Sequence, residues 1–518
     1  MLLDAVVATS RSVASTRSRL AKRQALASLL AGASPADVEI LVAYLAGELR
    51  QRRTGIGWAL LRSVPPPATD PTLTLIDVDR ELQRISELTG PGSAGLRTDA
   101  VQRLFARATA AEQDFLRRLI SGGIRQGALD SAMHDALAEA TGIPLSSIRR
   151  AVMLRGATGP VAAAALTGGV TALEAFRLEV GQPVLPMLAS TAPDLAAALA
   201  KLGTGQEVAI DTKLDGIRIQ AHKDRDAVRL FTRSLDDITD RLPEVVDVVR
   251  RCRADRLILD GEAISLDSAG RPRPFQETAA RTASRLDPAA PATAVSPFFS
   301  DCLSADGDDL IDLPLADRLA QLDSVVPDGS VVSRLVTAQV ASAQSFFDAA
   351  IRGGQEGVVV KALGSPYEAG RRGSGWVKVK PRQTLDLVVL GVEWGSGRRT
   401  GLLSNIHLGA RDPSSGGFVM LGKTFKGMTD EMLAWQTERF TELAVSPEAV
   451  RDSYVVAVRP EQVVEVAFDG VQRSSRYPGG VALRFARVVR YRDDKPAGEA
   501  DTIGTVREFL PQSDVPTP

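Results

Sequence analysis

The sequence predicts a chain of three structural units: an all-α unit, an α+β unit and a small closed β-barrel. Up to about residue 175 the chain is rich in Ala, Leu and Arg, with helical periodicity in the segments 110–120 and 128–140. Near residue 180 the pattern changes to short runs that alternate or are rich in β-branched residues. After Pro381 strand patterns dominate again, with one helix at about 429–443.

These changes of pattern give the boundaries of the predicted domains. A chain of 518 residues is long enough for two to four domains. The three domains and a disordered tail are expected at 1–175 (helical), 176–382 (α+β), 383–510 (barrel) and 511–518 (tail). The elements expected within the α+β domain are strands at 207–224, 227–234 and 256–267, a helix at 242–253 and a surface loop at 284–297.

Composition and cysteine usage exclude several classes of protein. The net charge is only −1, but residues 1–180 hold 21 Lys and Arg against 17 Asp and Glu, which fits either a polyanionic partner or a solvated helical surface. Cys252 and Cys302 are the only cysteines, which excludes a disulfide framework and a four-cysteine zinc module. The three histidines lie far apart, without a metal-binding spacing.

The N-terminal segment and the apolar runs bear on location. No stretch of about 18 consecutive apolar residues occurs, so we expect no transmembrane helix and a cytoplasmic protein. The first 30 residues are rich in Arg and Ser and poor in acids, as in a transit peptide. Their apolar residues recur at helical spacing, which favours a helix of the folded domain instead.

The segment KLDGIR at 213–218 has the residue types of a covalent nucleotide site. Lysine is a useful nucleophile when desolvation or nearby cations make its amine neutral. Gly216 lets the backbone approach a phosphate closely, and Arg218 can bind phosphate or ribose oxygens through its planar guanidinium. In isolation the Asp-Gly pair is also an ordinary hairpin turn.

Further charged blocks follow along the chain. They are TRS at 232–234, DGE at 260–262, FFSD at 298–301, EGVVVK at 356–361 and WVKVK at 376–380. In WVKVK the two-residue period of a strand puts Lys378 and Lys380 on one face. Carboxylates and cations that converge on one pocket are what metal-assisted chemistry on a triphosphate requires.

With these blocks in this order, the sequence resembles the covalent nucleotidyltransferase superfamily and, within it, the ATP-dependent DNA ligases, most closely the actinobacterial ligase B group. The segment LRFARVVRYRDDK at 483–495 is similar to the ligase motif on the OB domain. PMLA at 186–189 and SGGIRQGA at 121–128 are similar to the helical DNA-binding domain and its junction. The resemblance covers nearly the whole chain and implies a DNA-binding, an adenylation (nucleotidyltransferase) and an OB-fold domain.

The resemblance also implies roles for individual residues. Lys213 is implied to be the lysine that becomes adenylylated, and Asp211 to read the adenine amino group. Arg218 and Arg233 are implied to contact the nucleotide and the 5′-phosphate of a nick. The other implied residues are Glu262 and Glu356 at the ribose and a divalent metal (Mg²⁺ or Mn²⁺), Lys378 and Lys380 at the α-phosphate, Arg372 at the nucleotide, and Arg484, Arg487, Arg492, Asp494 and Lys495 in the C-terminal motif.

One position departs from the family pattern. The residue immediately before Asp301 is usually aromatic and stacks on adenine, but here it is Ser300. Phe298 lies on the same strand face and is the alternative platform, although Phe298 and Phe299 are equally well read as core residues. Arg125, between two helices, is expected to contact a DNA backbone phosphate or else to cap a helix.

Other functions fit the sequence less well. An RNA ligase or a capping guanylyltransferase shares the lysine block, but capping enzymes lack a long helical domain before it. An NAD⁺-dependent ligase carries a four-cysteine zinc module, and an inactive scaffold is not expected to keep Lys213, Glu262 and Glu356. Arg233 as a turn cap and the C-terminal arginines as a solvated strand face are the structural alternatives. We therefore expect a monomeric enzyme that seals nicks in duplex DNA with ATP, in replication, repair or recombination.

Overall fold

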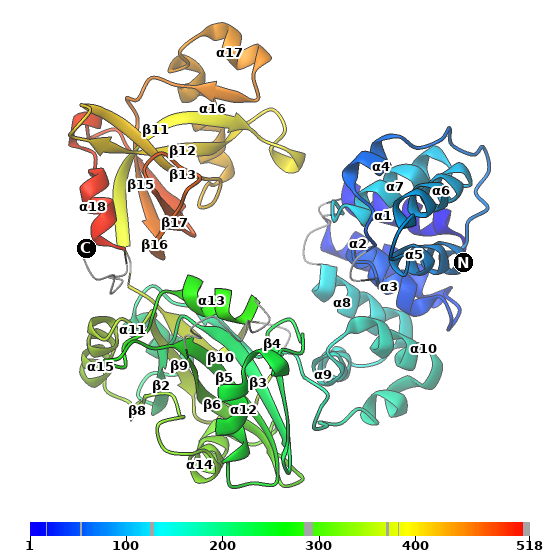
Figure 1. Cartoon of the computed structure of the whole chain (residues 1–518), viewed down its shortest axis with the longest axis horizontal. Helices are drawn as coiled ribbons and strands as arrows, with labels where there is room; N and C mark the ends of the chain where they lie inside the picture. Colours follow the sequence, from blue (N-terminus) through cyan, green and yellow to red (C-terminus); the bar gives the residue numbers. More distant parts are fainter. Residues whose placement is uncertain are drawn as a thin grey trace.

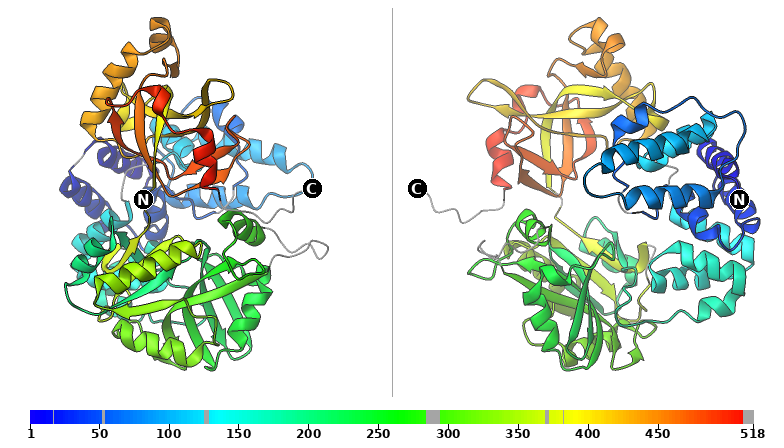
Figure 2. Two further views of the ribbon diagram at one scale, coloured as in Figure 1. Left: turned by 90° about the vertical axis from the view of Figure 1, so that its left-hand side faces the viewer. Right: turned by 45° about the vertical axis from the view of Figure 1, so that its right-hand side comes forward.

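The computed structural model describes residues 1–16, 18–51, 54–124, 129–283, 294–368, 372–381 and 383–510. Figure 1 shows three bodies that follow one another along the chain: a helical body, a mixed body of helices and sheets, and a strand-rich body. The views in Figure 2 show the helical body beside the other two. The predicted order of fold classes is confirmed. Among the described residues no helix is both long enough and apolar enough to span a membrane.

The N-terminal body is helical throughout its described part. Its helices are α1 (Leu3–Ser15), α2 (Arg19–Ala31), α3 (Val38–Ala46), α4 (Trp58–Arg62), α5 (Leu75–Ser86), α6 (Ser93–Ala106), α7 (Ala110–Ile120), α8 (Leu129–Thr141), α9 (Leu145–Arg155) and α10 (Thr158–Glu174). The N-terminal segment forms α1 and α2, as its helical spacing predicts. Capping boxes start α5 at Thr74 and α7 at Thr109, where each hydroxyl accepts a backbone N–H of the first turn.

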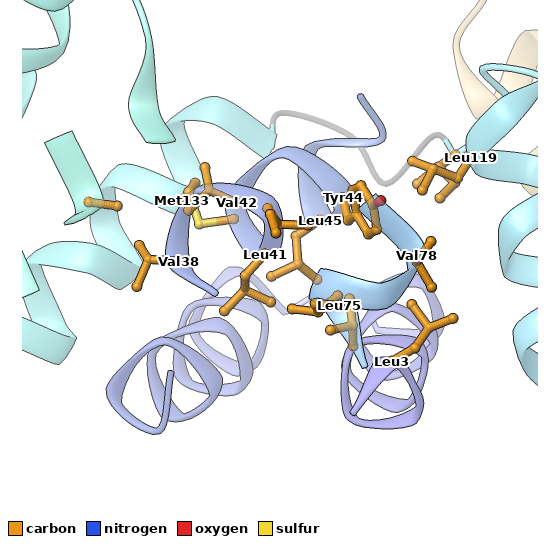
Figure 3. Close-up of a cluster of buried hydrophobic side chains, with 14 of the residues drawn as sticks. Leu3, Val38, Leu41, Val42, Tyr44, Leu45, Leu75, Val78, Leu119 and Met133 are labelled. Carbon is orange, nitrogen blue, oxygen red and sulfur yellow. The ribbon is translucent and has the colours of Figure 1, made fainter. Parts of the chain in front are cut away.

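Helix α3 lies at the centre of the N-terminal core. Its sequence VEILVAYLA is apolar almost all round, and a helix of that kind is stable only when it is buried. Figure 3 shows Leu41 and Leu45 of α3 close to Leu75 of α5, and Leu3 of α1 belongs to the same cluster. The helix ends at Gly47, whose φ of 77° supplies the left-handed cap that a side chain would disfavour.

The central body contains two five-stranded sheets. The first has the strand order β1-β10-β9-β2-β8, and the second has the order β4-β3-β5-β6-β7. Only β1 and β10 are parallel; the other neighbours in both sheets are antiparallel. The strands are β1 (Leu188–Thr191), β2 (Val208–Lys213), β3 (Ile217–Asp224), β4 (Ala227–Thr232), β5 (Arg256–Ser265), β6 (Val295–Ala305), β7 (Asp308–Asp309), β8 (Arg334–Thr337), β9 (Gly357–Ala362) and β10 (Arg372–Val379).

Helices cover the outer faces of both sheets. Helices α11 and α15 pack on the first sheet, and α12 and α14 pack on the second. The helices of this body are α11 (Leu195–Leu202), α12 (Pro243–Arg250), α13 (Phe275–Ala283), α14 (Leu315–Val325) and α15 (Val340–Arg352). Because β2 ends at Lys213 in the first sheet and β3 begins at Ile217 in the second, the chain crosses from sheet to sheet at 214–216. The lysine block therefore lies where the two sheets meet.

Strand β6 begins earlier than the sequence predicts. The surface loop expected at 284–297 lies outside the described residues at 284–293, but its last three residues already belong to β6. Val295 pairs with Ser265 of β5, and its side chain is buried. Pairing with a neighbouring strand thus extends β6 through residues that have loop composition.

The C-terminal body is a strand-rich domain in which the predicted closed barrel is not observed. Its main sheet has the order β13-β12-β11-β15-β18, with β14 beside β11, while β16 and β17 form a separate hairpin. Val488 of β18 donates its N–H at 2.9 Å to the carbonyl oxygen of Lys426, in the loop that follows β13. The two edge strands of the sheet, β13 and β18, therefore meet through this loop contact and do not pair with each other. The elements are β11 (Gln383–Trp394), β12 (Leu403–Asp412), β13 (Gly417–Thr424), α16 (Asp430–Glu442), α17 (Pro447–Asp452), β14 (Val455–Ala457), β15 (Val463–Phe468), β16 (Gly470–Arg473), β17 (Val481–Arg484), β18 (Arg487–Arg492) and α18 (Ile503–Glu508).

A buried ion pair joins β6 to α14. The Arg318 guanidinium donates to Asp301 Oδ1 at 2.8 Å and Oδ2 at 3.0 Å, and neither side chain is exposed to solvent. Arg318 also donates to the carbonyl oxygens of Leu313 and Ser365. Removing one partner of such a pair strands the other charge in the protein interior.

Asp301→Ala is therefore expected to lower the free energy of unfolding of the central domain by roughly 3–5 kcal/mol. Chemical denaturation of the full chain measures the change. Asp323→Ala, which removes an exposed carboxylate from α14, is the matched control and should stay within about 0.5 kcal/mol of the parent. Equal stability of the two variants would contradict the assignment.

Candidate active site

The facing sides of the two central sheets line an open cavity of about 760 Å³. Alternation along the strands decides which side chains reach it. In β5, Asp260 and Glu262 line the cavity, while Leu259 and Ala263 belong to the core on the other side. The predicted site residues that line the cavity are Asp211, Lys213, Arg218, Arg233, Glu262, Phe298 and Lys378.

Lys213 lies at the end of β2, with its ammonium group against the carboxylate of Glu356. The two residues are also joined through the backbone, where Glu356 donates its N–H to Lys213 O at 2.9 Å. A lysine amine attacks only in its neutral form, so Lys213 must lose a proton before it can act as a nucleophile, and the contact with the negative Glu356 opposes that loss. Loss of this contact would therefore favour the neutral, nucleophilic amine.

Lys380 contacts the second oxygen of the same Glu356 carboxylate. Its ammonium also donates to Asp469 Oδ2 of the C-terminal body at 2.9 Å. Burial alone would lower the pKa of Lys380, but these two carboxylates outweigh it and raise the pKa above its ordinary value. Lys380 therefore remains a cation and links the cavity to the C-terminal body.

Glu262 lies on β5 opposite the lysine block. Its Oε1 accepts the backbone N–H of Gly216 at 3.1 Å. A Cβ at Gly216 would lie 2.2 Å from Ile264 Cγ2 and 2.5 Å from Ala263 O, so only glycine lets the turn approach β5 this closely. Burial raises the pKa of Glu262 to about 7, against the opposing effects of Lys213, Arg218 and the Gly216 N–H, and the charge of Glu356 adds to the rise.

Arg218 is held by Asp260, a residue that our sequence analysis did not assign. The guanidinium donates to Asp260 Oδ1 at 2.9 Å and to the carbonyl of Met187 at 2.6 Å. The Tyr367 hydroxyl donates to Asp260 Oδ2 at 2.8 Å and accepts the Met187 N–H at 3.0 Å. Arg218 therefore lines the cavity with much of its hydrogen-bonding capacity already used.

Asp211 is also paired with two cations. Arg334 donates to its Oδ1 at 2.6 Å, and the Lys361 ammonium lies 2.7 Å from its Oδ2. Lys361 is buried over the Trp376 ring, 4.2 Å from the centroid, and donates to Ser300 O at 2.9 Å. This network holds a carboxylate and a backbone carbonyl side by side at one end of the cavity.

Several of these residues could have been found from the sequence. Asp260 is two residues before Glu262 in a strand, so the two-residue period points it toward the cavity. Trp376 stands on the same face as Lys378 for the same reason. Lys361 also lines the cavity, but it is five residues after Glu356, so the period gives no such signal for it. Arg334 has no such signal, because only the pairing of β8 with β2 brings it opposite Asp211.

The residues considered for stacking on adenine, Phe298, Phe299 and Ser300, point to different sides of β6. Phe298 and Ser300 line the cavity, whereas Phe299 points to the other side of β6 and is fully buried in the core. Arg233 lies in the exposed turn after β4 and also lines the cavity. The side chain of Arg372 and the whole of Arg125 lie outside the described residues.

The first part of the C-terminal motif reaches the central domain. Arg484 donates to Asp215 Oδ2 at 2.6 Å, inside the KLDGIR segment, and its guanidinium lies 5.3 Å from the Phe275 ring centroid. Arg487 donates to Asp469 Oδ1 at 3.0 Å, next to the contact between Asp469 and Lys380. These arginines contact the surroundings of the cavity without lining it.

The second part of the motif gathers within the C-terminal body. Arg492 and Lys495 donate to the same Asp386 oxygen, at 3.0 and 2.8 Å. Arg492 also donates to Asp494 Oδ1 at 2.8 Å. In this arrangement of domains, these three motif residues do not line the cavity.

The raised pKa of Glu262 gives a test by pH. Between its ordinary value of 4.5 and about 7, the folded chain keeps a proton that the unfolded chain releases, so the free energy of unfolding falls as pH rises through this window. Glu262→Gln should remove up to roughly 3 kcal/mol of this fall, measured in EDTA at pH 5 and pH 8. Glu207→Gln, at an exposed position, should follow the parent at both values. If the free energy of unfolding of Glu262→Gln falls between pH 5 and pH 8 as much as that of the parent, the assignment is wrong.

Comparison with known proteins adds to this geometry. Residues 186–380 match the family described as "ATP dependent DNA ligase domain", residues 399–495 the "ATP dependent DNA ligase C terminal region" and residues 59–138 the "DNA ligase N terminus". The solved structure Pmar-Lig_PreS3 superposes with a TM-score of 0.63 at 18% identity, over 94% of this chain and 99% of that one, and so shares the fold.

Curated relatives match over almost their whole length. A probable DNA ligase of Beutenbergia cavernae is 64% identical over 513 residues, which are 98% of this chain and 99% of the relative. DNA ligase B of Mycobacterium tuberculosis is 55% identical over 512 residues, with the same coverage of 98% and 99%. With family matches in all three bodies and relatives this similar over almost the whole chain, the chain belongs to the ATP-dependent DNA ligases.

Proposed function

We propose that the Lys213 amine is the nucleophile of this DNA ligase and that its substrate is a nick in duplex DNA. The observation that carries the proposal is the position of Lys213, which lines an open cavity between the two central sheets and contacts the Glu356 carboxylate. The volume of about 760 Å³ is large enough for a nucleotide.

The reaction follows in three steps. The neutral Lys213 amine attacks the α-phosphorus of ATP; a P–N bond forms, the bond to the bridging oxygen breaks, and pyrophosphate and a proton leave. An oxygen of the nick 5′-phosphate then attacks the same phosphorus, so that AMP moves to the DNA and the amine is restored with a proton. Finally the 3′-hydroxyl attacks the DNA 5′-phosphorus, loses its proton and displaces AMP.

The other site residues named in the sequence analysis have proposed roles. Asp211, with Ser300 O beside it, offers acceptors to the adenine amino group, and Phe298 offers a face on which the base can stack. Lys378 and Lys380 are cations placed to offset charge on the α-phosphate. Arg218 and Arg372 are proposed to contact the nucleotide.

The residues present also fit a divalent metal. Glu262 and Glu356 are close enough for the charge of one to raise the pKa of the other, and carboxylate oxygens are the ligands that Mg²⁺ or Mn²⁺ prefers. Among the described residues, no three or more His, Cys, Asp or Glu side chains lie so that they could hold a metal ion together. Phosphates and water would therefore complete the coordination shell of the metal, as is usual for Mg²⁺. When bound, the metal would offset negative charge on the triphosphate.

The other two bodies have proposed roles in binding and in domain motion. The helical body, residues 1–175, would grip the DNA backbone, with Arg125 as one phosphate contact. The C-terminal body, residues 383–510, would act as an OB-fold domain that closes over ATP in the first step and turns away for sealing. We propose that the protein acts as a monomer.

Lys213→Ala should abolish covalent labelling of the protein by α-labelled ATP and sealing of an ordinary nick. Sealing of a pre-adenylylated nick should partly survive, because that step needs no lysyl-AMP. The control is Lys201→Ala on α11, outside the cavity, which should label like the parent. Labelling of the Lys213 variant would show that another residue is the nucleophile.

Arg492→Ala and Asp494→Ala test the proposed domain motion. Both residues lie away from the cavity here, so they can act on ATP only if the C-terminal body moves. Lysine labelling should slow by roughly tenfold or more, while sealing of a pre-adenylylated nick is retained. The control is Arg490→Ala. Arg490 lies on the same strand as Arg492 and forms an ion pair with Glu465 of the neighbouring β15, and this variant should label at the parent rate. Parent rates in all three variants would remove the C-terminal motif from the first step.

A further inference from the structure

A strained residue lies two positions after Arg233. Leu235 has a φ of 66°, in the left-handed region that branched side chains rarely adopt. Hydrogen bonds hold the turn in this shape: Leu235 donates its N–H to Thr232 O at 2.9 Å, and Thr232 donates its N–H to Asp236 O at 2.9 Å. Backbone strain of this kind persists only where the surroundings enforce it, and it gathers at functional sites.

The Leu235 side chain packs against the helical body. Its Cδ1 lies only 2.6 Å from the point where a Cβ on Gly156 would be, and the carbonyl oxygen of Pro183 is 3.4 Å from the same point. Gly156 caps the end of α9 with a φ of 76°, so its backbone also favours glycine. Leu235 thus fills a space that exists only because position 156 has no side chain.

The same turn forms part of the cavity wall. Thr232, Arg233 and Ser234 all line the cavity, and Arg233 is exposed. Within the described part of the chain, the Arg233 side chain has no hydrogen-bond or ion-pair partner. Its position therefore depends on the turn that carries it, and one side of that turn is fixed by the contact with Gly156.

We propose that Leu235 and Gly156 are positioning residues that couple the docking of the helical body to the placement of Arg233 at the nick. The proposal rests on the proposed function and on the role at the nick 5′-phosphate that the resemblance to the ligase family implies for Arg233. When the helical body packs on the turn, Arg233 is held where it meets the phosphate that accepts AMP. Formation of lysyl-AMP involves no DNA, so it is independent of this contact.

Step-resolved kinetics on the full chain test the coupling. Lysyl-AMP enzyme is mixed with excess nicked duplex, and formation of adenylylated DNA is followed in a single turnover. Leu235→Ala and Gly156→Ala should each slow AMP transfer by roughly tenfold or more, while labelling by ATP stays at the parent rate. Leu235→Met, which keeps the volume of the contact, should restore most of the transfer rate.

Two further variants make the result specific. Arg225→Ala changes another left-handed residue, in the turn at the opposite end of β4, and should transfer AMP like the parent. Arg233→Ala should slow AMP transfer as much as Leu235→Ala does. The variant that carries both changes should be no slower than either single variant, because both changes remove the same function, the placement of Arg233.

The outcomes separate the two proposals. If Arg233→Ala transfers AMP at the parent rate, the proposed role of Arg233 is wrong. If Arg233→Ala is slow but Leu235→Ala and Gly156→Ala are not, the coupling is wrong and the role of Arg233 stands. If the Leu235 and Gly156 variants lose ATP labelling to the same extent as AMP transfer, the contact is merely structural and the coupling is overturned.

Discussion

The carboxylate of Glu356 is shared between Lys213 and Lys380, and the organisation of the cavity depends on this sharing. It brings together the end of β2, the start of β9 and the end of β10, which enter from different parts of the sequence. Through Lys380 and Asp469 it also extends to the C-terminal body. Because two ammonium groups share one carboxylate, the loss of either contact changes the electrostatic environment of the other lysine.

Two charged groups of the cavity wall, Arg218 and Asp211, are neutralised before any substrate binds. Arg218 forms an ion pair with Asp260, and Asp211 forms ion pairs with Arg334 and Lys361. All five residues lie on strands whose outer faces pack on helices. Isolated ions at such depth would be costly, and removing one partner leaves the other uncompensated. The same arrangement fixes the dipoles and charges in advance, so that little reorganisation remains when the phosphates react.

The sequence predicted the order of the three bodies from local periodicity, and it predicted several cavity-lining residues from the resemblance of its charged blocks to the ligase family. The two-residue period added only that Phe298 and Ser300 share one strand face, which is the face that lines the cavity. Arg334 and the contact of Gly156 with Leu235 could not be predicted, since they depend on which distant strands and helices become neighbours. Barrel closure was wrongly expected for a similar reason: strand number does not determine whether the two edges pair.

The contacts between Arg484 and Asp215 and between Lys380 and Asp469 have a further consequence for the energetics of the molecule. All four side chains keep between 18% and 32% of their surface in water. Ion pairs in such surroundings contribute about 1 kcal/mol or less each, so together these two pairs contribute a factor of at most about thirty to the docked arrangement. Other contacts lie beside them, such as Arg484 over the Phe275 ring. Added salt screens the ion pairs, so the electrostatic part of the attachment weakens as ionic strength rises.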